Sequence, residues 1–111
     1  MTLELRCSPK ELREIASGSR KTLTREIRPS NERRFVTLND EGEIIGIIEY
    51  DSLRLFSDRL KASLTVKVES SKLWEIEDDN GQLVYYTHNG VQHLSIEIDY
   101  LLGAILHKSN V

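Results

Sequence analysis

The sequence is poor in residues that would stabilise a small protein by means other than a hydrophobic core. It has one cysteine and two prolines among 111 residues, and no apolar run approaches the roughly 20 residues of a membrane-spanning helix. One cysteine, Cys7, excludes an internal disulfide and predicts a small buried hydrophobe in a reducing compartment. Three histidines (His88, His93 and His107) lack the spacing of metal ligands. We therefore expect a cytoplasmic protein without membrane contact, metal or cofactor.

Aromatic residues are few as well, at 6% of the chain, but the remaining composition is that of an ordinary globular protein. Hydrophobic residues make up 39% and charged residues 30%. This mixture excludes a disordered chain, a collagen and a disulfide scaffold. Because one domain typically takes about 100–150 residues, we expect a single domain over residues 1–111.

The charge is divided unevenly along the chain. Residues 1–34 hold nine Lys and Arg against five Asp and Glu, whereas residues 35–111 hold six against thirteen. The net charge of −3 therefore hides a basic first third and an acidic remainder, and this division is the main indication of function.

One helix is well marked near the N-terminus. Ser8-Pro9-Lys10-Glu11 has the pattern of a capping box with proline at the first helical position. Leu12, Ile15 and Ala16 form one apolar stripe, and Gly18 is suited to the left-handed residue that ends a helix.

The rest of the chain predicts strands. Residues 2–6 alternate apolar and polar, and turn clusters at 39–42, 78–81 and 89–90 separate further extended segments. These segments are 22–29, 33–38, 44–48, 50–56, 64–69, 73–76, 83–86 and 93–102. Gly103–Leu106 is expected to form a short turn or a final helical turn, although 96–107 also has helical spacing. The predicted fold is α+β, mainly β: a small antiparallel β-barrel of about five or six strands with an N-terminal helix.

The run from Lys10 to Pro29 resembles the ASCH (activating signal cointegrator homology) domains. Their signature is a helix ending in I-x-x-G, followed by roughly G-x-K-x-x-E-x-R. Without a gap, the family's lysine falls on Arg20, its arginine on Arg25 and its acidic position on Leu23, which departs from the pattern. With one residue inserted after the glycine, Lys21-Thr22-Leu23-Thr24 matches the K-T-x-T variant instead, and both registers stay open.

Further fragments, in order along nearly the whole chain, are similar to small ASCH-like proteins of Bacteroides-type bacteria, their phages and mobile elements. This resemblance implies a PUA-like β-barrel with its first helix at the barrel mouth. The fragments are Arg25–Pro29, Tyr50-Asp51, Leu53-Arg54, Thr65–Glu69, Asp78–Gly81, Ile98–Gly103 and Ile105-Leu106.

The cations of residues 20–34 predict an anion site. Guanidinium groups hold phosphate in two-point contact, and single-stranded bases stack on aromatic rings. With the ASCH resemblance, we expect RNA or a nucleotide-like anion in a basic cleft formed by the Gly18–Arg28 segment. The expected ligand-binding residues are Arg20, Lys21, Thr22, Arg25, Arg28 and Trp74. The alternative is that these cations form surface ion pairs with the later acidic residues.

A catalytic interpretation follows from the K-T-x-T variant. Some small ASCH proteins with this motif are amidohydrolases that deacylate N4-acetylcytidine, which implies catalytic roles for Lys21, Thr24 and a glutamate such as Glu75 or Glu77. Lys21 would deprotonate the Thr24 hydroxyl, which would attack the acyl carbon. The alternative is that Thr24 is simply a good strand residue.

Three hypotheses about function therefore stand. The first is an ASCH-like module that binds RNA or a nucleotide, and the second is a small amidohydrolase or RNA hydrolase acting on a modified nucleoside. The third is an accessory factor that interacts with proteins and takes no small ligand.

Overall fold

The N-terminal helix, α1 (Pro9–Ser17), begins and ends at the predicted residues in the computed structural model, which describes residues 1–111. The Ser8 hydroxyl accepts a hydrogen bond from the Glu11 backbone, and the Glu11 carboxylate accepts one from the Ser8 backbone. Gly18 ends the helix with a φ of 83°, a left-handed conformation that glycine adopts without strain. Both helix boundaries are therefore set by local chemistry.

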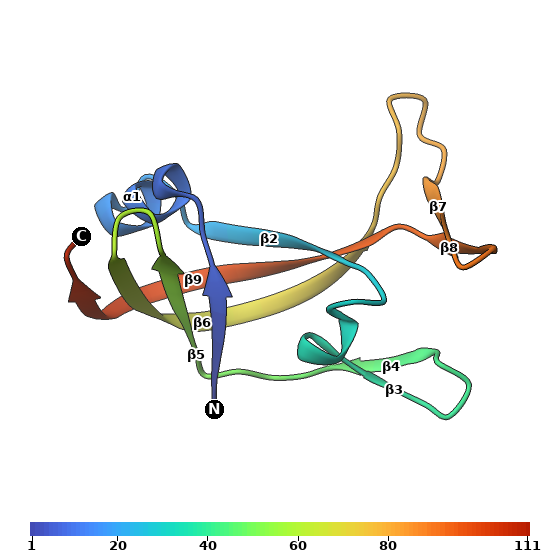
Figure 1. Cartoon of the computed structure of the whole chain (residues 1–111), viewed down its shortest axis with the longest axis horizontal. Helices are drawn as coiled ribbons and strands as arrows, with labels where there is room; N and C mark the ends of the chain where they lie inside the picture. Colours follow the sequence, from blue (N-terminus) through green and yellow to red (C-terminus); the bar gives the residue numbers. More distant parts are fainter. The chain divides into compact units, whose positions relative to one another are not determined.

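Nine strands and one short 3₁₀ helix form the rest of the chain, so the prediction of a mainly β fold with an N-terminal helix is confirmed (Figure 1). The 3₁₀ helix is η1 (Glu32–Arg34). The strands are β1 (Thr2–Arg6), β2 (Thr22–Ile27), β3 (Val36–Leu38), β4 (Ile44–Ile47), β5 (Ser52–Ser57), β6 (Ala62–Glu75), β7 (Tyr85–His88), β8 (Val91–Leu94) and β9 (Ile96–Ser109).

The strands form one five-stranded sheet and two hairpins. The sheet has the order β1-β5-β6-β9-β2, and the hairpins are β3-β4 and β7-β8. Because β1 and β2 stand at opposite ends of this order, the hydrogen-bonded strands do not close into a ring. A PUA-like barrel therefore stays a prediction. The helix is not long and apolar enough to cross a membrane.

Contacts between residues divide the chain into two units. The first unit comprises Met1–Leu23, Glu49–Ser71 and Tyr100–Val111, and the second comprises Thr24–Ile48 and Lys72–Asp99. Each unit is assembled from separated segments, and β6 and β9 contribute residues to both. One domain over residues 1–111 stays a prediction.

The first unit packs α1 against β5, and its core lies on one face of the β1-β5-β6 strands. Side chains alternate across these strands, because successive residues of a strand point to opposite faces. The buried residues include Leu3, Leu5, Leu12, Ile15, Leu53, Leu55, Leu64, Val66, Tyr100 and Leu102. Cys7 is also buried, as predicted.

The second unit contains both hairpins and η1. Its buried residues are Ile27, Phe35, Val36, Ser95 and Ile98. The predicted strand over 33–38 is shorter than expected, because Arg34 and Phe35 donate backbone hydrogen bonds to Asn31 and Glu32 and close a 3₁₀ turn.

Three further predictions about strands are wrong. The predicted strand 93–102 is divided at Ser95 between the end of β8 and the start of β9, which belong to different sheets. Residues 64–69 and 73–75 belong to one strand, β6, and residue 76 lies just beyond its end. The neighbour of β6 in the sheet, β9, is equally long at 14 residues. Gly103–Leu106 forms neither a turn nor a helical turn but continues β9. A Cβ atom at Gly103 would lie 2.1 Å from a Glu69 carboxylate oxygen, so this glycine marks a side chain crossing the strand, not the end of the strand.

Candidate functional site

The residues predicted to form a basic cleft fall in both units. Arg20, Lys21 and Thr22 belong to the first unit, whereas Arg25 and Arg28 belong to the second.

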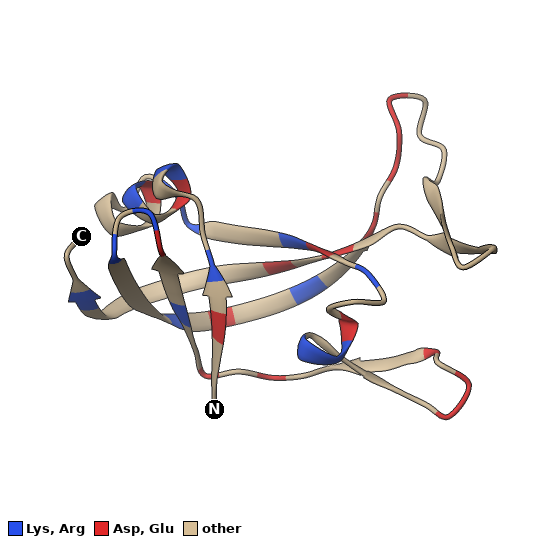
Figure 2. Cartoon of the chain, in the orientation of Figure 1, with Lys and Arg blue, Asp and Glu red and all other residues tan.

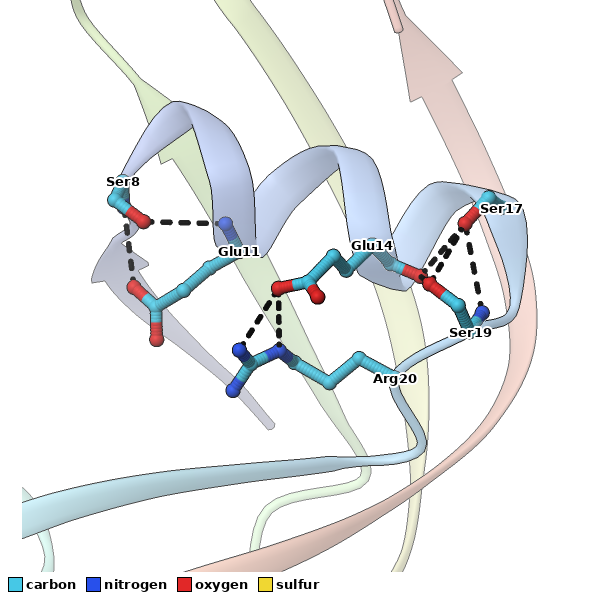
Figure 3. A network of polar contacts seen from close by, with 6 residues as sticks. All are labelled: Ser8, Glu11, Glu14, Ser17, Ser19 and Arg20. Atoms are coloured by element: carbon cyan, nitrogen blue, oxygen red, sulfur yellow. Dashed lines mark hydrogen bonds and ion pairs between the residues drawn. The ribbon is translucent and has the colours of Figure 1, made fainter.

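Arg20 is held by the helix that precedes it (Figure 3). Its guanidinium donates to one carboxylate oxygen of Glu14 at 2.8 and 3.3 Å, and its backbone N–H donates to the Glu14 carbonyl. The hydrogen bond to Glu14 raises the pKa of the Arg20 guanidinium. The hydroxyls of Ser17 and Ser19 also donate to the Glu14 carbonyl. Arg20 therefore has a structural role at the end of α1.

Lys21 lies beside the same helix end. Its ammonium nitrogen is 3.6 Å from the point that a Cβ on Gly18 would occupy. A cation here interacts favourably with the negative end of the helix dipole. The Lys21 carbonyl accepts a backbone hydrogen bond from Leu102, and the side chains of Lys21 and Thr22 are exposed.

In the second unit, Thr24 meets a carboxylate that the sequence did not single out. Its hydroxyl donates to Asp99 at 2.5 Å. A hydroxyl has a single proton to donate, so Thr24 donates it to Asp99 and not to Lys21, the expected base. Glu75 is exposed at the end of β6. Arg25 lies on the opposite side of the strand from Thr24, is half-buried, and donates to the Thr24 carbonyl at 2.8 Å.

Arg28 is the predicted ligand-binding residue with the most informative surroundings. Its guanidinium carbon lies 3.7 Å from the centre of the Tyr86 ring, which is a close cation–π contact. Glu26 accepts a hydrogen bond from the same guanidinium at 2.5 Å, and the Arg28 backbone donates to Asn31 at 2.8 Å. The guanidinium is therefore held over the ring.

Tyr86 also stacks on His93, with ring centres 5.3 Å apart and planes inclined by 20°. The two residues are direct partners across the β7-β8 hairpin. The hairpin turns at Asn89-Gly90, where both residues have positive φ. Neither ring was among the predicted ligand-binding residues, although the two stand at equal distances from a recognised two-residue turn, which would have paired them.

A cavity of about 480 Å³ lies beside this stack. Tyr86 and His93 line it together with apolar residues from β2, β4, β8 and β9, and with two carboxylates from η1 and the β3-β4 turn. The apolar residues are Ile27, Ile44, Leu94 and Ile96, and the carboxylates are Glu32 and Glu43. The cavity is of the size that small ligands occupy in proteins.

The Tyr86 phenol is protonated under ordinary conditions. Burial raises the pKa of Tyr86, the Arg28 guanidinium lowers it, and the carboxylates of Glu32 and Glu26 raise it. Burial is the largest of these effects, so the net shift is upward. The hydroxyl can therefore donate a hydrogen bond to a ligand at neutral pH.

Trp74 is 49% exposed, and the Lys72 ammonium lies 5.7 Å from its ring centre. Its neighbour Leu73 is half-buried, which agrees with the expected alternation. The cavity beside Tyr86 is not lined by Trp74. This ring and its cation are a separate exposed feature of the second unit.

The two units differ in charge. The first holds ten Lys and Arg against seven Asp and Glu, whereas the second holds five against eleven. In the second unit, acidic residues gather at the turn of the β3-β4 hairpin and in the segment before β7 (Figure 2). The basic first third of the sequence therefore does not make the unit with the aromatic cavity basic.

Comparisons with protein-family models, curated proteins and solved structures gave no match. No group of three or more His, Cys, Asp or Glu residues is arranged to hold a metal ion.

Proposed function

We propose that the chain binds the base of a nucleotide, free or within RNA, in the cavity beside Tyr86 and His93. The observation that carries the proposal is the stack of the Arg28 guanidinium, the Tyr86 ring and the His93 ring at this cavity. Unpaired bases are commonly bound by stacking on aromatic rings and guanidinium planes.

The other residues of the cavity favour a base over a phosphate. Exocyclic amines of cytosine and adenine donate hydrogen bonds, which the carboxylates of Glu32 and Glu43 can accept. Isoleucine and leucine side chains offer apolar contact to a planar ring. Because the second unit carries a net charge of −6, a polyphosphate would be repelled from it. The sugar and phosphate therefore extend away from the cavity toward solvent.

The ASCH resemblance supports the same class of ligand. We include a PUA-like architecture in the proposal. From the ASCH-like segment, Ile27 lines the cavity and Arg28 holds the Tyr86 ring beside it. Arg20 and Lys21, which belong to the first unit, have contacts at the end of α1 and are not needed for base recognition.

The proposal is tested by isothermal titration of the protein with cytidine, adenosine and their 5′-monophosphates. Tyr86→Ala is expected to weaken binding at least about tenfold, because it removes the central ring of the Arg28–Tyr86–His93 stack that a base would extend, and one lost stacking contact is worth about 1–3 kcal/mol. Arg28→Ala should weaken binding of the same ligands, because it removes the group that holds the Tyr86 ring in place.

Tyr85→Ala is the matched control. Tyr85 is 51% exposed, precedes Tyr86 on the same strand and does not line the cavity. Equal loss of affinity in the two tyrosine variants would contradict the proposal. Absence of binding by the wild-type protein would also contradict it, and would favour the hypothesis of an accessory factor that interacts with proteins.

A second candidate function is hydrolysis of an acylated nucleoside, and the Thr24–Asp99 contact favours it. A carboxylate within hydrogen-bond reach of a hydroxyl is the arrangement of a general base beside a nucleophile. In this proposal the Thr24 oxygen attacks the acyl carbon while Asp99 accepts its proton, the amide C–N bond breaks, and the exocyclic amine leaves with that proton. Water then hydrolyses the Thr24 ester to release the carboxylic acid. Lys21 and Glu75 are the further residues that the sequence motif implicates.

This candidate is tested by incubating the protein with N4-acetylcytidine and measuring release of cytidine by chromatography. Thr24→Ala and Asp99→Asn should each abolish release, whereas Thr37→Ala, at an exposed threonine of β3 outside the motif, should not. Lys21→Ala and Glu75→Gln show separately whether the motif lysine and the expected glutamate are needed for release of cytidine. Absence of turnover by the wild-type protein would exclude this substrate.

A further inference from the structure

The face of the β1-β5-β6 strands opposite the core of the first unit carries a second group of cations around an aromatic ring. In register, Arg6 lies opposite Phe56, Glu4 lies opposite Arg54, and Ser63 lies opposite Phe56 on the other side. Their neighbours along each strand, such as Leu5, Leu55 and Leu64, point into the core. We call the surface formed by Glu4, Arg6, Arg54, Phe56 and Ser63 the Phe56 face.

The Phe56 ring lies close to two guanidinium groups. The guanidinium carbon of Arg6 is 5.7 Å from the ring centre, and that of Arg54 is 5.8 Å from it. Phe56 is half-buried, so part of its side chain is exposed to solvent. An aromatic ring with guanidinium groups at this distance can stack a base and hold the adjoining phosphate.

A cavity of about 710 Å³ adjoins the ring. Arg54 and Lys61 contribute cations to it, and Ser57, Ser63 and Ser109 contribute hydroxyls. Hydroxyls and cations together are the side chains that most often contact the sugar and phosphate of nucleic acids.

Two carboxylates at this surface are paired with its cations. Asp58 lies 3.0 Å from the Arg6 guanidinium, and Glu4 lies 3.4 Å from that of Arg54. In the first pair both side chains are at least 70% exposed, and in the second they are 43% and 63% exposed. Exposed ion pairs contribute little net stability, so an incoming phosphate can replace the carboxylates at low cost.

The charge of the first unit selects the kind of ligand. Its ten Lys and Arg against seven Asp and Glu give a net charge of +3, whereas the second unit is negative. We propose that the Phe56 face binds single-stranded RNA, with one base stacked on Phe56 and the adjoining phosphates held by Arg6, Arg54 and Lys61.

The test measures the anisotropy of a fluorescent oligouridylate of about ten nucleotides during titration with the full chain. Phe56→Leu keeps an apolar side chain but removes the aromatic ring, and it is expected to weaken binding about tenfold. Arg54→Gln should weaken binding and reduce the slope of log K against log salt by about 0.7 for each lost phosphate contact.

Arg59→Gln is the control with the same change in charge. Arg59 is exposed in the turn between β5 and β6 and does not line the cavity. If Arg59→Gln and Arg54→Gln weaken binding equally and Phe56→Leu has no effect, binding is diffuse electrostatic attraction and the proposal is wrong. Binding of an acidic peptide to this face, with no binding of the oligouridylate, would indicate a protein partner and would also overturn the proposal. Far-UV circular dichroism establishes that each variant is folded.

This inference and the proposed function fail separately. In a Tyr86→Ala protein, the part of oligouridylate binding that depends on Phe56 should persist. In a Phe56→Leu protein, binding of a free nucleoside, which has no phosphate, should be unchanged. If the wild-type protein binds the oligouridylate but no nucleoside, only the proposed function is contradicted. If it binds nucleosides but Phe56→Leu does not change oligouridylate binding, only the site on the Phe56 face is contradicted.

Discussion

The behaviour of Tyr86 is determined by residues that are distant from it in the sequence. Its ring is covered by the Arg28 guanidinium and stacked on His93, and burial raises its pKa. None of these neighbours is within two residues of Tyr86 along the chain. The sequence around Tyr86 therefore does not show how this tyrosine behaves. Its contacts and its raised pKa depend on the β7-β8 hairpin and on Arg28, which follows β2.

At the residue scale, we predict that the Tyr86 phenol titrates above the usual pKa of about 10. The difference between the absorbance titrations of the wild-type and Tyr86→Phe proteins isolates this phenol. A difference curve with its midpoint at or below pH 10 would contradict the upward pKa shift.

The same shift predicts how stability depends on pH. A group whose pKa is raised by folding contributes stability below its unfolded pKa, and this contribution is lost as pH rises through the folded pKa. Urea unfolding should therefore show wild-type stability decreasing above about pH 10. The decrease should be smaller in Tyr86→Phe, which has no phenol at this position.

At the scale of elements, α1 and the long strands differ in how their boundaries are determined. The capping box and Gly18 act within a few residues, so the helix was predicted at both ends. The length of β6 and β9 depends on strand pairing between residues far apart, so local polar residues and Gly103 suggested breaks that do not occur. Local signals are sufficient for the helix and insufficient for the long strands.

We predict that Gly18→Ala lowers the free energy of unfolding by about 1–2 kcal/mol, because alanine is disfavoured in the left-handed region. Space is not the cause, since the nearest atom to an added Cβ is the Lys21 ammonium at 3.6 Å. Gly46→Ala is the control, because Gly46 has no positive φ and no atom within 4 Å of an added Cβ. It should leave stability unchanged or raise it by up to about 1 kcal/mol. Urea unfolding measures both variants, and a larger loss for Gly46→Ala would refute the argument.

At the scale of the whole molecule, the charge is divided between the two units, and this division does not follow the division between the basic first third and the acidic remainder of the sequence. The first unit takes its residues from the beginning, middle and end of the chain and is positive, and the second is negative. The electrostatic difference therefore favours RNA at the Phe56 face and a base, not a polyphosphate, at the Tyr86 cavity.

Because β6 and β9 contribute residues to both units, we predict that the units unfold in one transition. Urea unfolding followed by Trp74 fluorescence, which reports on the second unit, should coincide with unfolding followed by far-UV circular dichroism. Leu53→Ala in the first core should lower the unfolding free energy by about 2–5 kcal/mol, and Phe35→Ala in the second by about 3–5 kcal/mol. Both changes should shift both signals together. Separate transitions would mean that the units unfold independently.

The sequence by itself determined the features that depend on near neighbours: the helix with its two caps, the mainly β character, the hairpin turns and the burial of Cys7. It also identified Arg28 as a candidate ligand residue. Only the tertiary structure decided what Arg28 and Thr24 contact, and it joined Phe56 to Arg6 and Arg54. The physical reason is that side-chain contacts across strands depend on strand pairing and register, which bring together residues far apart in the chain, whereas caps and turns depend on residues a few positions apart.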